Sequence, residues 1–116
     1  MNIKIIKEPV TIAEVQALAK EIYGDMIKGV ADVERGIMAL GGEYHIDANS
    51  KLIKAGSSQS DLWGFNIYFK RDGEDWIECT SLINIRPQEG NRGMLISDQN
   101  LVKRIRNIVE KLIIRI

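Results

Sequence analysis

The chain has 116 residues, of which 45% are hydrophobic and 28% charged, fractions typical of one folded domain and not of a disordered or fibrous protein. Its 16 basic and 16 acidic side chains cancel, so no overall field would attract nucleic acid or an anionic membrane. A single cysteine excludes an internal disulfide. No apolar run approaches the roughly 18 residues that a membrane-spanning helix needs. We therefore expect a single soluble domain over residues 1–116, located in the cytoplasm.

A short strand and a helix are expected first. Ile3–Ile6 is a short apolar run that is typical of an edge or starting strand. Thr11 is followed three residues later by Glu14, the spacing of a capping box, which predicts a helix immediately after it. Apolar residues then recur at helical spacing until Gly24 provides a stop, so we expect this helix over residues 12–23.

The segment 26–40 fits two structures. Its apolar residues match a helical period, but Gly29 and Gly36 would each destabilise a helix interior by roughly 1 kcal/mol. A hairpin whose three-residue turn ends at Gly36 explains more of the sequence, and this hairpin would pair Val30 with Leu40. We prefer the hairpin.

The next segment contains paired glycines, Gly41 and Gly42, which suggest a bulge or a close backbone approach. We expect the strand to continue through residues 43–45. Capping residues and a terminal glycine then predict one short helix between Asp47 and Gly56.

Residues 61–86 predict a second, longer hairpin. Phe65 and Ile67 alternate onto one face, as do the apolar residues of the returning half. The two apolar faces coincide only if the turn has an odd number of residues. We therefore expect a three-residue turn, residues 71–73, which pairs Ile67 with Ile77.

A broad apolar stripe from residue 98 to 115 predicts a C-terminal helix, capped by Ser97. The expected fold class is α+β, with an antiparallel sheet of four to five strands in two hairpins packed against the N-terminal and C-terminal helices. The tail, residues 112–116, carries more apolar side chains than one helix face can bury. We therefore expect a homodimer formed through this tail.

Three segments of the chain resemble those of a known family. They are GIMALGGEYHID from Gly36, DLWGFNIY from Asp61 and SLINIRPQEGNR from Ser81. In their order and gaps they resemble an uncharacterised prokaryotic family of small proteins, a domain of unknown function, over nearly the whole chain. Gly93-Met94 departs from the more polar continuation expected there. The resemblance implies a shared fold and a shared site, but no chemistry.

One candidate catalytic site is centred on His45, the only histidine. On a strand, Glu43 and Asp47 would project to the same side and give a base with an orienting carboxylate, or a partial metal site. A metal site normally needs about four ligands, so we expect no metal and no cofactor. A surface or helix-capping role is the preferred interpretation. The alternative is a small hydrolase or lyase with His45 as base. In it Glu43 or Asp61 would orient the base, and Arg86 would stabilise an anion.

A polar cluster near the end of the second hairpin is the other candidate site. Two guanidinium groups backed by amides and by loop N–H groups suit a small anion, a carboxylate or a phosphate. The alternatives are that Arg86 pairs with Asp61 or Glu78, or that the chain is an interaction module without a pocket. Nucleic acid is not expected, because the aromatic residues belong to the core rows. The expected ligand-binding residues are Asn66, Asn84, Arg86, Asn91 and Arg92.

Overall fold

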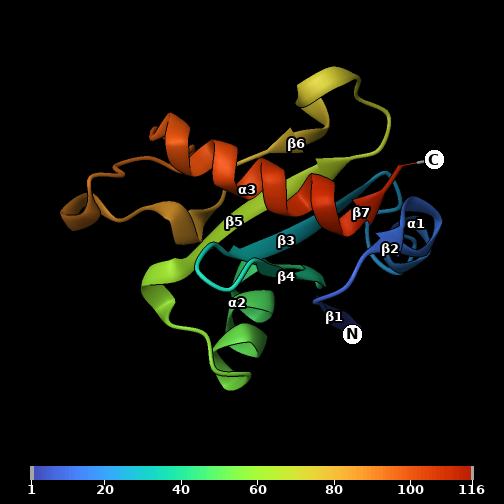
Figure 1. Cartoon of the computed structure of the whole chain (residues 1–116), viewed down its shortest axis with the longest axis horizontal. Coiled ribbons are helices and arrows are strands. Elements are labelled where there is room, and N and C mark those ends of the chain that lie inside the picture. Colours follow the sequence, from blue (N-terminus) through green and yellow to red (C-terminus); the bar gives the residue numbers. More distant parts are fainter. Residues whose placement is uncertain (1, 116) are drawn as a thin grey trace.

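The computed structural model describes residues 2–115 and arranges them as an α+β fold around a five-stranded antiparallel sheet (Figure 1). The strands, in spatial order, are β1 (Ile3–Ile6), β4 (Ile37–Gly41), β3 (Met26–Asp32), β5 (Leu62–Tyr68) and β6 (Ile77–Glu78). The helices are α1 (Ile12–Ala19), α2 (His45–Lys54) and α3 (Gln99–Leu112). A separate parallel pair joins β2 (Val10–Thr11) to β7 (Ile113–Ile114).

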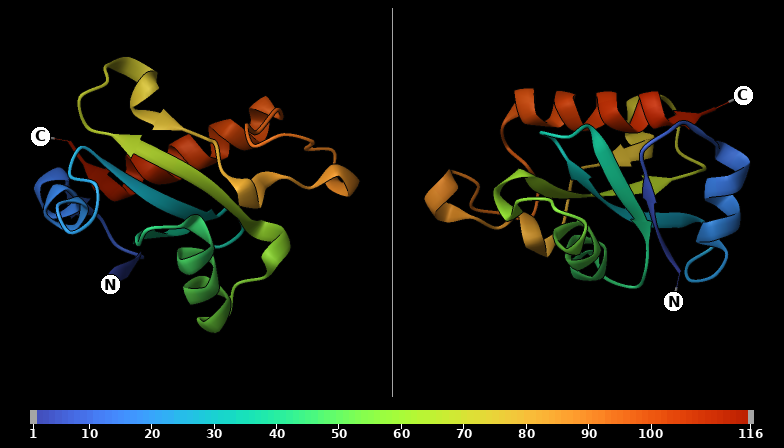
Figure 2. Two further views of the ribbon diagram at one scale, coloured as in Figure 1. Left: turned by 180° about the vertical axis from the view of Figure 1, so that it is seen from behind. Right: turned by 60° about the horizontal axis from the view of Figure 1, so that its bottom comes forward.

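The core is divided by the sheet into two layers. On one face, Phe65 packs in a cluster with Val15 of α1 and Ile105 of α3. On the other face, Val30 packs with Leu52 of α2. Figure 2 shows α2 and α3 on opposite sides of the sheet. Both faces of the central strands are therefore apolar and covered by helices.

The boundaries of α1 and α3 follow from their caps. The hydroxyl of Thr11 accepts a hydrogen bond from the Glu14 N–H at 3.2 Å, as the sequence predicts, but the helix ends at Ala19 instead of residue 23. The cap of α3 is Asp98, whose carboxylate accepts from two N–H groups of the first turn at 2.9 and 3.3 Å. The prediction of Ser97 as this cap is wrong.

The expected strand at residues 43–45 is wrong, because the chain turns at Gly41 and Gly42. Both glycines have positive φ angles, +114° and +86°, which end the strand. A side chain at Gly41 would also meet the carbonyl oxygen of Asn2 at 2.4 Å. His45 consequently begins α2, two residues earlier than the predicted helix.

The first hairpin exists, with its register shifted by one residue from the prediction. Val30 pairs with Ala39 instead of Leu40, because the loop contains the four residues 33–36. The carboxylate of Asp32 accepts from the two N–H groups that open this loop, at 3.0 and 2.9 Å. Val30 and Leu40 therefore lie on opposite faces of the sheet.

The second hairpin keeps the predicted pairing of Ile67 with Ile77. Its connection is longer than three residues and contains a 3-10 helix, Gly73–Trp76, which buries the Trp76 ring in the core. The returning strand ends at Glu78, so the prediction of a long second strand is wrong. The predicted polar cluster, which follows β6 in the chain, therefore lies outside the strands of the sheet.

The apolar C-terminal tail is used inside the chain. Leu112 and Ile113 are buried, and Ile113 pairs with β2. Ile116, the last residue of the expected dimer surface, lies outside the described residues. The tail therefore gives no support to the expected homodimer. Within residues 2–115, no helix is both long and apolar enough to cross a bilayer.

Candidate functional site

The backbone of β5 is where the predicted site residues meet. The His45 ring hydrogen-bonds to the Phe65 carbonyl, the Asn84 side chain binds the peptide groups of Gly64, and Arg86 donates to a carbonyl at the start of the strand. Three residues from separate elements therefore hydrogen-bond to the same strand, at Leu62, Gly64 and Phe65. Their shared partner is main chain, so these bonds use hydrogen-bonding groups that a ligand would otherwise need.

Asn84 completes the edge of the sheet where β6 has ended. It is fully buried, and its Oδ1 accepts from the Gly64 N–H at 2.8 Å. Its Nδ2 donates to the Gly64 carbonyl at 3.0 Å and to the Met94 carbonyl at 3.3 Å. An amide side chain offers the same donor and acceptor as a peptide group, so Asn84 takes the place of a strand residue beside β5.

Arg86 is buried and held mainly by backbone. Its guanidinium stacks 4.0 Å from the centre of the Trp63 ring and lies 3.9 Å from Glu89. This ion-pair partner differs from the predicted Asp61 or Glu78. Burial lowers the pKa of Arg86, and Glu89 acts in the opposite direction. The guanidinium donates to the carbonyls of Ile83 (3.2 Å), Ser60 (3.5 Å) and Leu62.

Asn91 shapes the loop that follows. Its amide donates to the carbonyls of Asn84 and Gly93 at 2.8 and 3.0 Å, while its oxygen accepts from the N–H and hydroxyl of Ser97. The peptide groups of Arg86 and Asn91 also pair, at 2.7 and 3.1 Å. Arg92, in contrast, is exposed. Of the two predicted guanidinium groups, one is built into the fold and the other faces solvent.

A cavity of about 270 Å³ lies beside His45, at the start of α2 and against β5. Its wall combines a polar part with apolar side chains from the segment after β6. The lining residues that carry polar groups are Lys28, Tyr44, His45, Asn66, Thr80 and Ser81, and the apolar ones are Ile46, Leu82, Ile83 and Met94. We call this space the His45 cavity.

His45 is buried and hydrogen-bonds through Nε2 to the carbonyl oxygen of Phe65 at 2.8 Å. A carbonyl can only accept, so Nε2 carries the proton. Burial lowers the pKa of the imidazole, and the charge of Lys28 lowers it further. The hydrogen bond to Phe65 and the neighbouring Asn66 amide act in the opposite direction. The ring is therefore neutral at pH 7, with an unprotonated Nδ1.

Asn66 places a buried amide in the wall of the His45 cavity. The residue is 7% exposed, and its Nδ2 donates to Glu78 at 3.2 Å and to the Thr80 carbonyl at 3.3 Å. Its Oδ1 has no hydrogen-bond partner within residues 2–115. A buried polar atom without a partner destabilises a fold by about 1–3 kcal/mol.

Gly64 allows two of the lining residues to approach the sheet. A Cβ at this position would lie 2.5 Å from Ser81 Cβ and 3.2 Å from His45 Cδ2. The side chains of Ser81 and His45 therefore both pack against the backbone of β5 at Gly64. The sequence contains a signal for this contact, since a glycine inside an alternating strand often marks a close approach. Lys28 carries no such signal, and sequence reasoning missed it.

The predicted carboxylate partners of His45 are not arranged along one strand face. His45 begins a helix, in which residues two positions apart point in different directions. Glu43 is exposed in the turn before it, Asp47 lies in the first turn of α2, and Asp61 ends a 3-10 helix. Within residues 2–115, no three His, Cys, Asp or Glu side chains gather closely enough to hold a metal ion.

A family model matches residues 4–112 of the chain. The chain belongs to the family described as protein of unknown function (DUF5674). The matched range includes β5, the His45 cavity and the Arg86 loop. No curated protein and no solved structure matches the chain. The description of DUF5674 names no chemistry.

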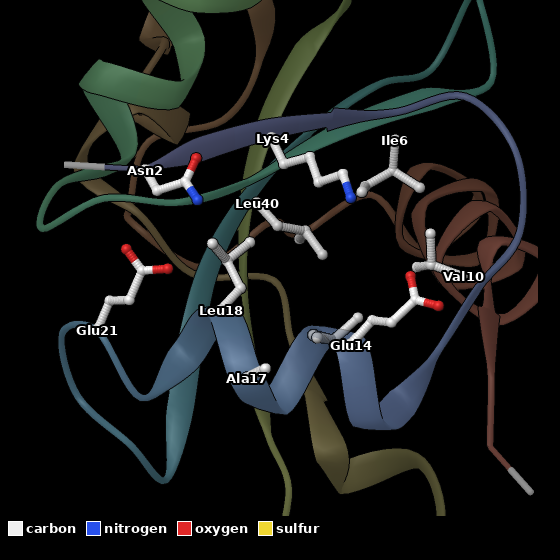
Figure 3. A pocket seen from close by; sticks show the side chains of 10 residues that line it. Asn2, Lys4, Ile6, Val10, Glu14, Ala17, Leu18, Glu21 and Leu40 are labelled. Atoms are coloured by element: carbon white, nitrogen blue, oxygen red, sulfur yellow. The ribbon is translucent and has the colours of Figure 1, made fainter.

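A second hollow of the DUF5674 fold, of about 310 Å³, lies between β1 and α1 (Figure 3). Its apolar lining includes Ile6 and Leu40 of the sheet and Leu18 of the helix. Figure 3 shows the Lys4 side chain running along β1 and Glu14 reaching up from α1. We call this space the β1–α1 hollow.

Proposed function

We propose that this protein binds a small molecule in the His45 cavity, and that the ligand carries a hydrogen-bond donor and an anionic group. The buried Oδ1 of Asn66 is the observation that carries the proposal. Folded proteins rarely leave such an acceptor without a partner. An N–H or O–H of the ligand, placed against this oxygen, supplies the missing hydrogen bond.

Lys28 is the cation that we assign to the anionic group. It stands directly opposite Asn66 in the pairing of β3 with β5, so both side chains lie on the same face of the sheet. The guanidinium of Arg86 is already engaged with carbonyls, and for this reason we move the predicted anion site from Arg86 to Lys28. A carboxylate or a phosphate satisfies this requirement.

The apolar wall of the cavity defines the rest of the ligand. Leu82 is 72% exposed and Tyr44 is 60% exposed, and both stand at the mouth with Met94. Contiguous exposed apolar patches often mark ligand-binding grooves. A volume of about 270 Å³ falls just below the usual range for drug-sized ligands. The ligand is therefore a compact amphiphile, with an apolar body between its donor and its anion.

The test is a thermal-shift screen of small carboxylates and phosphates that also contain an N–H or O–H group. A ligand at about 100 times its dissociation constant stabilises the fold by roughly 2.7 kcal/mol, a shift of several degrees. Lys28→Gln is expected to weaken binding about tenfold or more, since it removes a charge-assisted hydrogen bond. Asn66→Leu, which keeps the volume and removes the acceptor, is expected to act similarly.

Arg92→Gln is the matched control, because Arg92 is exposed in the polar loop and lies outside the cavity lining. Binding is expected to be unchanged in this variant. Ligands that depend on Arg92 and not on Lys28 would place the anion in the loop, as the sequence predicts, and would overturn the proposal. So would a wild-type protein that no ligand of this class stabilises. Circular dichroism of each variant verifies that it is folded.

General-base catalysis in the same cavity is a second candidate function. The lowered pKa of His45 favours it, because a neutral imidazole can accept a proton from a bound substrate. The test follows each ligand found above by NMR for chemical conversion. Conversion that His45→Gln abolishes, with binding retained, would support a hydrolase or lyase. Ligands that stay unchanged in the presence of wild-type protein would exclude catalysis on them.

A further inference from the structure

The two edges of the main sheet differ. At one edge, Asn84 occupies the place of a strand residue beside β5, and Thr80 forms an isolated bridge with Leu95. At the other edge lies β1, which within residues 2–115 pairs only with β4. An open edge strand presents N–H and C=O groups on which another strand can be built. One carbonyl of β1, that of Ile3, accepts from Lys51.

Hollows flank β1 on both faces of the sheet. Lys4 and Ile6 line the β1–α1 hollow, while Ile3 and Ile5 line a groove of about 610 Å³ against α2. Because strand side chains alternate between the faces, an added strand would place its own side chains alternately toward these two spaces. Within residues 2–115 no second strand pairs with β1, so these side chains are left beside the two hollows.

Charge selects among the strands that could pair with β1. A lysine in the middle of an edge strand usually discourages pairing, and Lys4 holds this position. The same lysine favours a partner that brings a carboxylate close to it. Glu14 stands at the Ile6 end of the β1–α1 hollow (Figure 3), and within residues 2–115 it forms no ion pair with Lys4. Among the ion pairs of residues 2–115, neither Lys4 nor Glu14 takes part, so a cation and an anion lie beside this edge.

We propose that β1 pairs antiparallel with β1 of a second copy of this chain, with Ile5 opposite the same residue of the other copy. A two-fold axis through this point places Lys4 opposite Ile6 of the second copy. Lys4 then approaches Glu14 of the second copy, and the symmetry repeats this contact. The main sheet continues through both copies, and the half-buried Ile3 and Ile5 lose their remaining contact with water.

The interface is expected to be modest in strength. Four strand residues with flanking helices bury less surface than the roughly 1,200–2,000 Å² of a stable complex. We therefore expect a reversible dimer with a dissociation constant on the order of 10–100 µM. Sedimentation velocity over about 5–500 µM should show the sedimentation coefficient rising with concentration. Hydrogen exchange of Ile3–Ile6 should slow over the same range.

Charge reversal tests the register. Lys4→Glu and Glu14→Lys are each expected to raise the dissociation constant about tenfold or more, because like charges then face each other. The double variant restores opposite charges and should recover the dimer. Lys103→Glu is the control, as this exposed lysine lies on α3, away from β1. It makes the same charge change and should leave the dimer intact.

Three results would overturn the proposal. The first is a protein that stays monomeric at every concentration, which would leave the edge to a different partner. The second is a dimer whose β1 amides exchange at an unchanged rate. The third is a dimer that Lys4→Glu does not weaken, which would place the contact elsewhere, for instance on the apolar mouth of the His45 cavity. Melting curves show whether each variant remains folded.

Discussion

Three polar side chains, those of Asn84, Arg86 and Asn91, hydrogen-bond to the main chain of β5 and of the segments around it. Asn84, Arg86 and Asn91 are polar residues where a core strand would be apolar, and the sequence marks them correctly as unusual. Their bonds go to main chain, because the strand ends at Glu78 and leaves the peptide groups of β5 without a partner. Where a strand ends depends on tertiary packing, which alternation along a sequence does not reveal. For this reason the structural role of these residues was not predictable.

Gly64 is the position at which one added methyl group should have the largest effect on the His45 cavity. In Gly64→Ala, the new Cβ would lie 2.5 Å from Ser81 Cβ, so either the side chains or β5 must move. We expect a loss of about 1–3 kcal/mol of unfolding free energy, measured by urea denaturation. Gly93→Ala is the control, since nothing lies within 4 Å of its Cβ position. Equal stability of the two variants would show that the cavity wall is not tightly packed.

His45 should make stability depend on pH in a defined direction. Its pKa is lowered in the folded protein, so the unfolded state binds a proton more readily. The stabilisation from the neutral ring is present above the unfolded pKa of about 6.5 and is lost as pH falls through the window below it. The slope cannot exceed about 1.4 kcal/mol per pH unit. We expect the unfolding free energy to fall more steeply between pH 7 and 5 in wild type than in His45→Gln.

NMR titration of the same ring provides an independent measurement. The imidazole protons of His45 are the only histidine signals in the spectrum, since the chain contains one histidine. They should titrate below the ordinary value of about 6.5 in the free protein. An anion bound beside Lys28 should move this pKa upward, because it offsets the charge that lowers it. A free-protein pKa at or above 6.5 would contradict the buried, neutral state.

At the scale of elements, the sequence was sufficient to predict which residues of β5 and β6 face the same side of the sheet. The length of the connection between these strands was not predictable. The apolar faces of β5 and β6 coincide only when Ile67 meets Ile77, whatever lies between them. The connection is longer than a tight turn because Trp76, which is buried, needs room to reach the core. Alternation therefore determines which residues face the same way. The space that a large side chain requires is a tertiary effect.

The first hairpin shows the opposite error. Its existence follows from two glycines that disfavour a helix, yet its register is shifted because the side chain of Asp32 accepts hydrogen bonds within the turn. This carboxylate is fully buried and also accepts from the Ser57 hydroxyl at 2.6 Å. An aspartate before a turn is a visible signal for such a loop. Placing His45 on a strand was the more serious error, because His45 begins α2 and the expected carboxylates do not share one face with it.

For the molecule as a whole, the C-terminal tail, which the sequence predicts as a dimer surface, pairs instead with β2 of its own chain. The α+β class was predictable from periodicity, and Ile3–Ile6 was predicted as an edge or starting strand. The parallel pairing of β2 with β7 was not, because it joins segments from opposite ends of the chain. Because Ile113 is buried by this pairing, the apolar character of the tail does not by itself indicate a dimer. The dimer proposed above uses the edge of β1 instead of the tail.

Neighbouring isoleucines in β7 distinguish these two roles of the tail. Ile113 is 2% exposed and Ile114 is 39% exposed. Ile113→Ala should lower the unfolding free energy by about 2–4 kcal/mol, as expected for a buried isoleucine, and Ile114→Ala by less than about 1 kcal/mol. Both proteins should retain the concentration-dependent dimer, because β1 is intact in each. If Ile114→Ala abolished dimerisation while stability stayed unchanged, the tail would be the interface and the pairing of β1 with a second copy would be wrong.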